Sequence, residues 1–147
     1  MLRPVQPDDI AIFFDQQTDT VALEMAAVPT RDRAAHDAHW TRVLADPSVV
    51  IRTVVDRAVV VGNVVSFVVD GERNVGYWIG RSYWGRGLAT RALAEYLDLV
   101  TERPLYAHVA DSNQASVRVL AKCGFDVVGS HRDDRDGVVE IVLRLDA

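Results

Sequence analysis

The chain has 147 residues, with 16 Lys and Arg residues against 21 Asp and Glu residues, and therefore a formal net charge of −5. This length fits one compact domain with its own core, the single cysteine excludes an internal disulfide, and no apolar run is long enough to span a bilayer. We therefore expect residues 1–147 to form one cytoplasmic domain with no membrane partner, and the acidic total disfavours a nucleic-acid partner.

The first third of the chain predicts one short strand and two helices. Residues 2–6 favour a strand, and the acidic residues that follow suit the first turn of a helix over about residues 9–18. Residues 19–29 are expected to form a loop or an irregular helix. A second helix is predicted to run from Thr30, its N-cap, to about residue 45. Its apolar face would consist of His36, His39, Trp40, Val43 and Leu44.

The middle of the chain predicts an antiparallel meander of three strands. Residues 49–55, 58–69 and 75–79 are dense in β-branched side chains. The pairs Asp56-Arg57 and Asp70-Gly71 fall where tight turns are needed between these strands. Gly62 interrupts the long middle strand and predicts a bulge there.

The last third alternates between helices and strands. An amphipathic helix is predicted over about residues 86–101, then a strand over 105–110 and a shorter helix over about 113–122. Two final strands, at 125–128 and 138–145, are joined by a polar segment over residues 131–137. Hairpins together with strand–helix–strand crossovers predict an α+β fold with a mixed, mostly antiparallel sheet.

The strongest local signal is the segment from Gly76 to Thr90, in which a strand leads through a glycine turn into a helix. Gly85 and Gly87 remove side chains where a ligand approaches the backbone. The free N–H groups of the helix start, with Arg86 beside them, would cradle a pyrophosphate. A plain strand-to-helix turn that uses glycine for its geometry is the alternative. The segment lacks the Gly-Lys pair of a Walker A loop and the third glycine of a dinucleotide-binding turn.

A second segment supplies the resemblance. Residues 107–116 read Ala-His-Val-Ala-Asp-Ser-Asn-Gln-Ala-Ser, and residues 122–125 read Lys-Cys-Gly-Phe. Together with the Tyr-Trp-Gly-Arg-Gly-Leu-Ala-Thr run at 83–90, they resemble the GCN5-related N-acetyltransferase (GNAT) superfamily over nearly the whole chain. The form of that run is most similar to the ribosomal-protein N-terminal acetyltransferase branch.

The resemblance implies a GNAT fold of six to seven strands and about four helices, with acetyl-CoA as the acyl donor and no metal. It implies that a bulge in the strand around Tyr77 splays that strand from strand 105–110 and so opens the cofactor cleft. It also implies direct attack by a primary amine on the thioester, so that Cys123 needs no role as a nucleophile. The residues expected to contact acetyl-CoA are Tyr77, Trp78, Ile79, Gly85, Arg86, Gly87, Leu88, Ala89, Thr90 and Asn113.

The chain departs from the family pattern where proton transfer is concerned. Leu120 stands where many members carry a tyrosine acid, and Asn74 stands where a glutamate is common. The resemblance then favours Ser116 as the proton donor. His108, five residues before Asn113, occupies the place where some members carry a glutamate base, and an imidazole can accept a proton at neutral pH. The alternatives are a solvent-facing strand histidine and a helix-capping serine.

These observations predict an acetyl-CoA-dependent N-acetyltransferase that acts on a protein N-terminus or on a small amine. A catalytically weak acetyl-CoA-binding module with a regulatory or assembly role is the alternative. His36 and His39 lack a third ligand, so we expect no metal site on their helix. Apolar surface near Trp40 would support a homodimer. Arginine supplies every basic residue except Lys122, a composition typical of a GC-rich bacterial genome.

Overall fold

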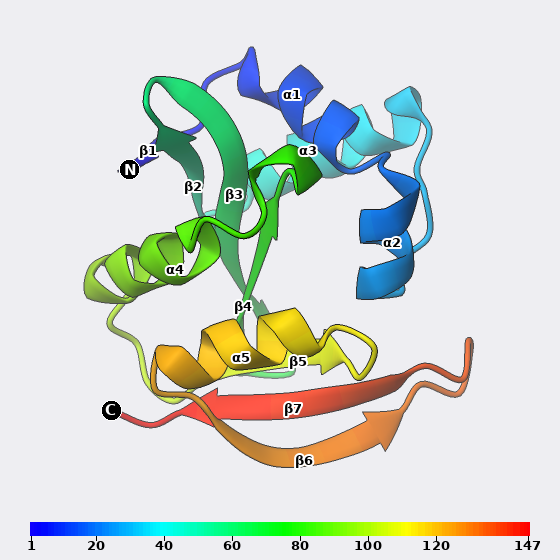
Figure 1. The fold of residues 1–147 in the computed structure, drawn as a ribbon, viewed down its shortest axis with the longest axis vertical. Helices are drawn as coiled ribbons and strands as arrows, with labels where there is room; N and C mark the ends of the chain where they lie inside the picture. The colour runs from blue at the N-terminus through cyan, green and yellow to red at the C-terminus, as the bar shows by residue number, and fades with distance from the viewer.

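A seven-stranded sheet in the order β1-β2-β3-β4-β5-β7-β6 runs through the computed structural model, which describes residues 1–147 (Figure 1). The strands are β1 (Leu2–Arg3), β2 (Val50–Asp56), β3 (Val59–Val69), β4 (Glu72–Ile79), β5 (Leu105–Ala110), β6 (Asp126–Arg132) and β7 (Val139–Leu145). The helices are α1 (Asp9–Gln16), α2 (Thr20–Ala26), α3 (Arg33–Ala45), α4 (Leu88–Leu99) and α5 (Gln114–Lys122). Only β4 and β5 are parallel neighbours, which confirms the mixed, mostly antiparallel sheet.

Both predicted turns of the meander are present, but the first lies at Arg57 and Ala58 rather than at Asp56-Arg57, because Asp56 still pairs with Val59 as the last residue of β2. Arg57 and Ala58 join β2 to β3, and Asp70 and Gly71 join β3 to β4, all with positive φ. Positive φ at both central residues gives the turn that matches the twist of a two-residue hairpin. The predicted bulge lies beside Gly62, because the pairing of β2 with β3 shifts register next to that residue. A Cβ at Gly62 would lie 2.0 Å from the carbonyl oxygen of Trp78, so that only glycine fits there.

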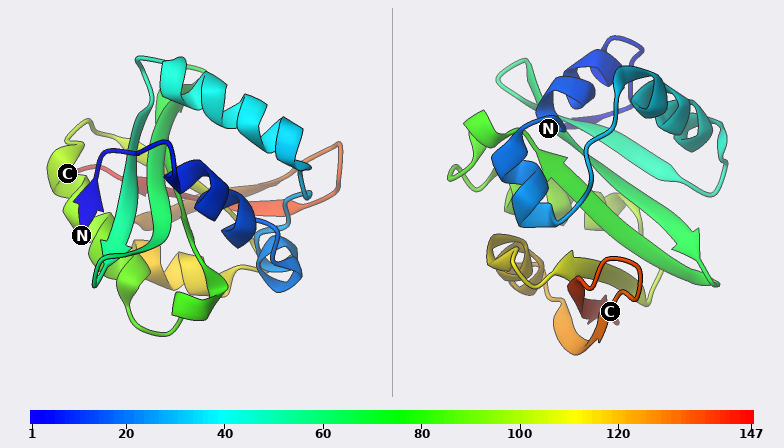
Figure 2. Two further views of the ribbon diagram at one scale, coloured as in Figure 1. Left: turned by 90° about the horizontal axis from the view of Figure 1, so that it is seen from above. Right: turned by 90° about the vertical axis from the view of Figure 1, so that its right-hand side faces the viewer.

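Helices cover the two faces of the sheet separately (Figure 2). In the left view, α4 and α5 lie on one side of the sheet, and α1 and α3 lie on the other. The larger core lies on the α4–α5 side and is centred on fully buried Leu93 and Tyr96 of α4. A smaller core on the opposite side joins Phe13 of α1 to Trp40 of α3, with ring centroids 4.9 Å apart.

The first strand and the early helices differ from the prediction in their limits. β1 ends at Arg3 because Pro4 and Pro7 cannot donate to a sheet. Residues 19–29 contain a regular helix, α2, because the side chain of Asp19 accepts a hydrogen bond from the Ala22 N–H at 3.0 Å and caps it. α3 begins two residues later than predicted, with Asp32 rather than Thr30 as its N-cap.

Asp9 begins α1 as predicted, but it serves the core rather than only the helix dipole. Its side chain is 3% exposed and accepts hydrogen bonds from Arg3 at 2.7 and 2.9 Å and from the Thr53 hydroxyl at 2.7 Å. Burial disfavours the charged carboxylate, yet these bonds and one from the Gln6 N–H outweigh it and lower the pKa of Asp9. Asp9 therefore ties β1, α1 and β2 together.

Three limits in the second half also differ. β4 begins at Glu72, three residues before the predicted start, because the tight Asp70-Gly71 turn lets pairing begin at once. α4 begins at Leu88, after a 3-10 turn over Arg81–Tyr83. β6 extends to Arg132, so that His131, predicted in a polar connection, lies in a strand opposite β7.

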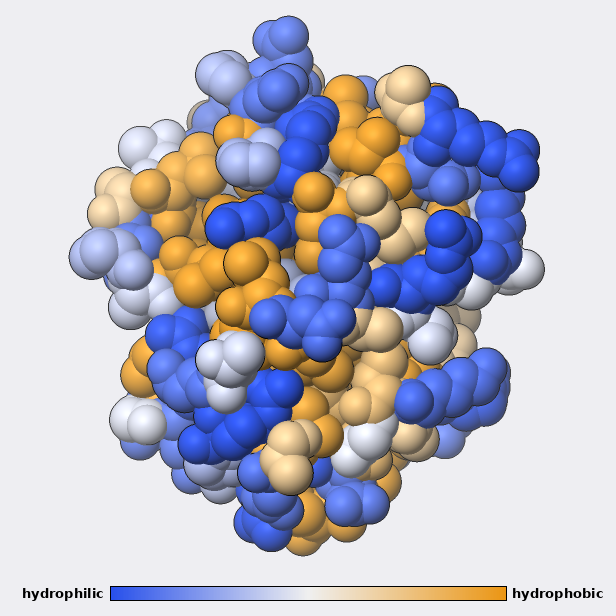
Figure 3. All heavy atoms as spheres, turned by 90° about the vertical axis from the view of Figure 1, so that its left-hand side faces the viewer, coloured by the Kyte–Doolittle hydropathy of each residue, from blue (hydrophilic) through white to orange (hydrophobic).

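The surface keeps several apolar side chains exposed. Figure 3 shows one face, on which apolar residues gather near the middle among hydrophilic ones. Trp40, around which a dimer surface was expected, is itself buried, and of its helix face Leu44 is 51% exposed. A homodimer thus stays a prediction. None of the helices is long and apolar enough to cross a membrane.

Candidate active site

The site begins where β4 and β5 separate. The two parallel strands share a single paired position, Asn74 with Tyr106, and the residues beyond it are not paired across the two strands. The resemblance implied a bulge in β4 at this point, and that expectation is wrong. The register of β4 with β3 runs unbroken from Glu72 to Ile79, so β4 stays flat on β3 while β5 diverges.

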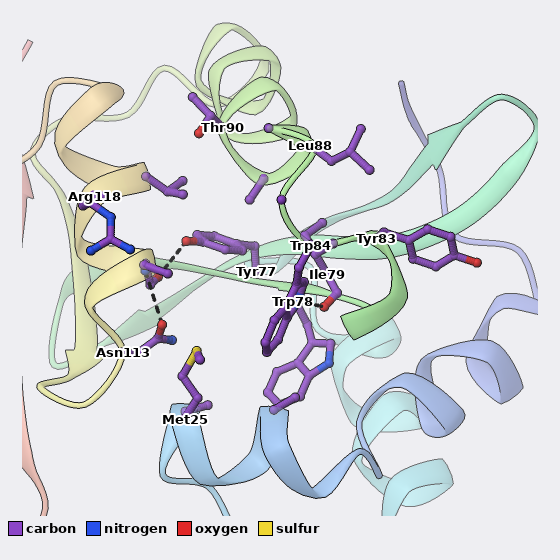
Figure 4. A pocket seen from close by; sticks show the side chains of 18 of the residues that line it. Met25, Tyr77, Trp78, Ile79, Tyr83, Trp84, Leu88, Thr90, Asn113 and Arg118 are labelled. Carbon is purple, nitrogen blue, oxygen red and sulfur yellow. Dashed lines mark hydrogen bonds between the residues drawn. The ribbon is translucent and has the colours of Figure 1, made fainter.

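A cleft of about 340 Å³ occupies this opening, lined from both faces of the sheet (Figure 4). Tyr77 of β4 points toward α5, whereas the Trp78 indole reaches the other face and donates to the Gln16 carbonyl at 3.1 Å. Met25 of α2 lines the cleft from that second face. The cleft therefore gives access to one point in the sheet from two opposite directions.

Most of the predicted cofactor residues line this cleft together. Those that do so are Tyr77, Trp78, Ile79, Gly85, Gly87, Leu88, Ala89, Thr90 and Asn113. Arg86 is the exception, because its exposed guanidinium lies 5.7 Å from the centre of the Tyr83 ring, outside the lining.

The start of α4 presents unpaired backbone donors to the cleft. Gly87 is the N-cap of α4 and makes no side-chain cap, and the N–H groups of Leu88, Ala89 and Thr90 have no backbone partner. Gly85 and Gly87 have φ values of +78° and +72°, and a Cβ at either would meet no protein atom within 4 Å. Free donors at the positive end of a helix, with open space before them, suit a pyrophosphate.

Two cations of α5 add positive charge to the cleft. Arg118 and Lys122 both line it, on the side facing the start of α4 (Figure 4 labels Arg118). They are four residues apart and therefore lie on one face of the helix. The four-residue spacing can be seen in the sequence, where Lys122 is the only lysine. It does not by itself indicate a binding site, because only the structure shows that α5 lies opposite the start of α4.

Ser116 and Tyr77 meet inside the cleft. Asn113 caps α5, its side-chain oxygen accepting from the Ser116 N–H at 3.3 Å, so its amide nitrogen stays free for a ligand. The Ser116 hydroxyl, 9% exposed overall, lies 2.7 Å from the Tyr77 hydroxyl. Burial raises the pKa of Tyr77 to about 12, despite the opposing bond to Ser116. Tyr77 thus stays protonated at neutral pH and can donate to the serine.

His108 lies on the opposite face of the sheet from this pair. Leu105, Ala107 and Val109 of β5 belong to the core beneath α4 and α5. Because side chains alternate along a strand, His108 points to the other face, where it is exposed. It does not line the cleft. Its ring packs edge-on against that of His131, with centroids 5.5 Å apart.

Cys123 stands apart from the chemistry. Its thiol is half-buried at the end of α5, lies 3.7 Å from the carbonyl oxygen of Thr90, and does not line the cleft. Burial raises the pKa of the Cys123 thiol, which disfavours the reactive thiolate.

Comparison with solved structures finds the same fold elsewhere. The aminoglycoside acetyltransferase AAC(6')-Ib, solved in complex with coenzyme A, matches with a TM-score of 0.83 and 18% identity over 99% of this chain and 94% of that chain. Spermidine N-acetyltransferase from Vibrio cholerae, in complex with CoA and spermine, gives 0.85 and 14% identity over 99% and 94%. A GNAT-family acetyltransferase from Bacillus anthracis gives 0.82 and 14% over 99% and 93%. These likenesses establish the shared fold.

Sequence comparison supplies the family. No curated protein sequence matches the chain significantly. The family model described as "Acetyltransferase (GNAT) domain" matches residues 1–126, which contain every residue of the cleft. The chain therefore belongs to the GNAT acetyltransferase family and is an acetyl-CoA-dependent N-acetyltransferase.

Proposed function

We propose that the chain transfers the acetyl group directly from acetyl-CoA to a primary amine that enters from the α2 side of the sheet. The observation that carries this proposal is the cleft lined from both faces at the divergence of β4 and β5. The phosphate-binding features lie at the start of α4 and on α5. Met25 and Trp78 line the opposite opening of the cleft, through which the amine would enter.

The residues around the cleft fit acetyl-CoA at both its ends. The open backbone at Gly85 and Gly87, with Arg118 and Lys122 across from it, would hold the phosphates. The free amide nitrogen of Asn113 would donate to the pantetheine arm. Acetyl-CoA supplies an activated thioester, and the chain contributes position and proton transfer.

Ser116 and Tyr77 form the proposed proton donor. As the amine nitrogen bonds to the carbonyl carbon and the carbon–sulfur bond breaks, the leaving sulfur needs a proton. The 2.7 Å contact allows either hydroxyl to donate; with the Tyr77 O–H donating to the Ser116 oxygen, the serine proton would be free to point to the leaving sulfur. This pair would take the role of the tyrosine acid that many family members carry at the position of Leu120. The Leu120 side chain is buried in the core.

His108 is the proposed acceptor of the amine proton, through water. It lies on the same face of the sheet as the proposed amine entrance, because Trp78 and Met25 line the cleft on the side opposite α5. No Asp or Glu lines the cleft, so no carboxylate there competes for this role. Since His108 itself does not line the cleft, a water chain must connect the two.

The acceptor is tested with a panel of amines. Thiol release from acetyl-CoA is measured in the presence of chelator with spermidine, with kanamycin and with peptides of free N-terminus. Small amines are tested first because the proteins of similar fold include an aminoglycoside acetyltransferase and a spermidine N-acetyltransferase. The peptides test the resemblance to the ribosomal-protein branch. CoA binding without thiol release for any amine would instead indicate the catalytically weak binding module.

A further inference from the structure

Three potential metal ligands gather on the open face of the C-terminal part of the sheet. His108 of β5, His131 of β6 and Glu140 of β7 each offer one ligand atom, and these atoms all lie within 4.8 Å of one another. Within the cluster, His131 Nε2 and Glu140 Oε1 are 3.2 Å apart. None of them lines the acetyl-CoA cleft.

The strand register explains why these residues meet. His131 lies directly opposite Glu140 in the β6–β7 pair. Glu140 lies opposite Ala110 of β5, and His108 is two residues before Ala110, so His108 is the diagonal neighbour of Glu140. Directly opposed and diagonal residues share one face of a sheet and are within reach of long side chains. The register of three hydrogen-bonded strands therefore places all three side chains on one face, within reach of one another.

The local environment is accessible and leaves the ligands free. The side chains of His131 and Glu140 are 48% and 31% exposed, and His108 is exposed. Arg144, four residues farther along the same face of β7, is paired with Asp146 at 2.8 Å. The only polar contact of Glu140 is His131 itself, so a metal ion bound here would break no ion pair of this carboxylate with a residue outside the cluster.

We propose that His108, His131 and Glu140 bind one Zn²⁺ ion, with water completing its coordination. Two imidazole nitrogens and one carboxylate oxygen form a ligand set suited to zinc, with an open fourth position. Ligands about 2.0–2.1 Å from zinc lie about 3.4 Å apart in a tetrahedral site. The 3.2 Å pair already has about this spacing, and the His108 nitrogen, within 4.8 Å of both other atoms, needs to approach them by at most about 1.4 Å.

This ion is not a cofactor of acetyl transfer, which needs no metal. The ion would nevertheless coordinate His108, the proposed acceptor of the amine proton. A ring nitrogen that coordinates zinc cannot accept a proton, so the two roles cannot be filled by the same nitrogen at once. Metal binding is therefore measured without acetyl-CoA or amine, and its outcome does not depend on the proposed function.

The test is titration of the untagged chain with Zn²⁺ by calorimetry, with Co²⁺ as a spectroscopic probe. We expect one equivalent of Zn²⁺ to bind saturably and Co²⁺ to show no sulfur charge-transfer band. His131→Gln and Glu140→Gln should each weaken binding by about tenfold or more, whereas His39→Gln, which removes a histidine of α3, should leave it unchanged. All three variants change partly or largely exposed side chains, and thermal unfolding checks their folding.

Two results would overturn the proposal. One is the absence of saturable 1:1 Zn²⁺ binding by the wild-type chain. The other is equal Zn²⁺ affinity in the wild type, His131→Gln and Glu140→Gln, which would place any bound ion elsewhere.

Discussion

Replacing Gly87 by alanine tests whether the start of α4 holds the phosphates of acetyl-CoA. Gly87 has φ +72°, and its Cβ would point into open space rather than into protein. The alanine therefore introduces no clash within the chain, and its cost to folding comes from the left-handed backbone alone. That cost is about 1–2 kcal/mol, which lowers the unfolding temperature by roughly 3–8 °C for a chain of this size.

The effect on binding should be larger and separate. The added methyl group takes up open space in the lining of the cleft at the start of α4, where the N–H groups of Leu88, Ala89 and Thr90 are unpaired, and would displace a phosphate bound there. Loss of one hydrogen bond to a charged group costs about 1.5–3 kcal/mol, which corresponds to about a 10- to 150-fold higher Kd for CoA. Calorimetric titration with CoA measures this directly.

Gly71 offers a matched control. It has φ +78°, a Cβ there would likewise meet no protein atom within 4 Å, and it lies in the β3–β4 turn outside the cleft. Gly71→Ala should therefore lose the same stability as Gly87→Ala but keep the wild-type affinity for CoA. If both variants bind CoA like the wild type, the phosphates lie elsewhere and the reasoning about α4 is refuted.

Four further predictions follow. Ser116→Ala and Tyr77→Phe should each lower kcat about 100-fold or more with little change in the KM for acetyl-CoA; equal rates would leave the hydrogen bond between Ser116 and Tyr77 a structural one only. Arg118→Ala should weaken CoA binding about 10-fold, with an effect that shrinks at high salt; salt-independent weakening would contradict an ionic contact. His108→Gln should lower kcat without changing CoA affinity, measured with chelator present; an unaltered kcat would exclude His108 from proton transfer. Asp9→Asn should lower the free energy of unfolding by about 1–3 kcal/mol at pH 7. Since the folded-state pKa of Asp9 is lowered, this difference is present above the unfolded value near 4 and should vanish as the pH falls through the folded value; denaturant unfolding at pH 7 and 3 that shows a constant difference would refute it.

The helices and strands were largely predictable because most show a clear periodicity of apolar residues. The β-branched runs and the two turn pairs defined the meander, and the apolar spacing of residues 88–99 defined α4. α2 was left open because only seven residues form it, and a short helix depends on its cap and tertiary packing. Its cap, Asp19, was the readable signal.

The positions of the site residues relative to one another were predictable only where a family motif occupies contiguous residues. The glycine turn and the start of α4 lie together in the sequence, so their joint position at the cleft could be expected. The Tyr77–Ser116 bond joins residues 39 positions apart, and the cluster of His108 with His131 depends on the register of three strands. Neither juxtaposition has a local signature, because both arise from how β4 and β5 diverge and how β7 inserts between β5 and β6.

The most direct test of the central proposal measures both products of a single reaction mixture. With an amine identified from the panel, released CoA thiol and acetylated amine are quantified together by absorbance and mass spectrometry. Direct transfer through the cleft predicts equal amounts of both products, no acetyl group on the protein, loss of turnover at a fixed low acetyl-CoA concentration in Gly87→Ala, and wild-type turnover in Gly71→Ala. Acetylated protein as an intermediate, or CoA binding without amine-dependent thiol release, would contradict it.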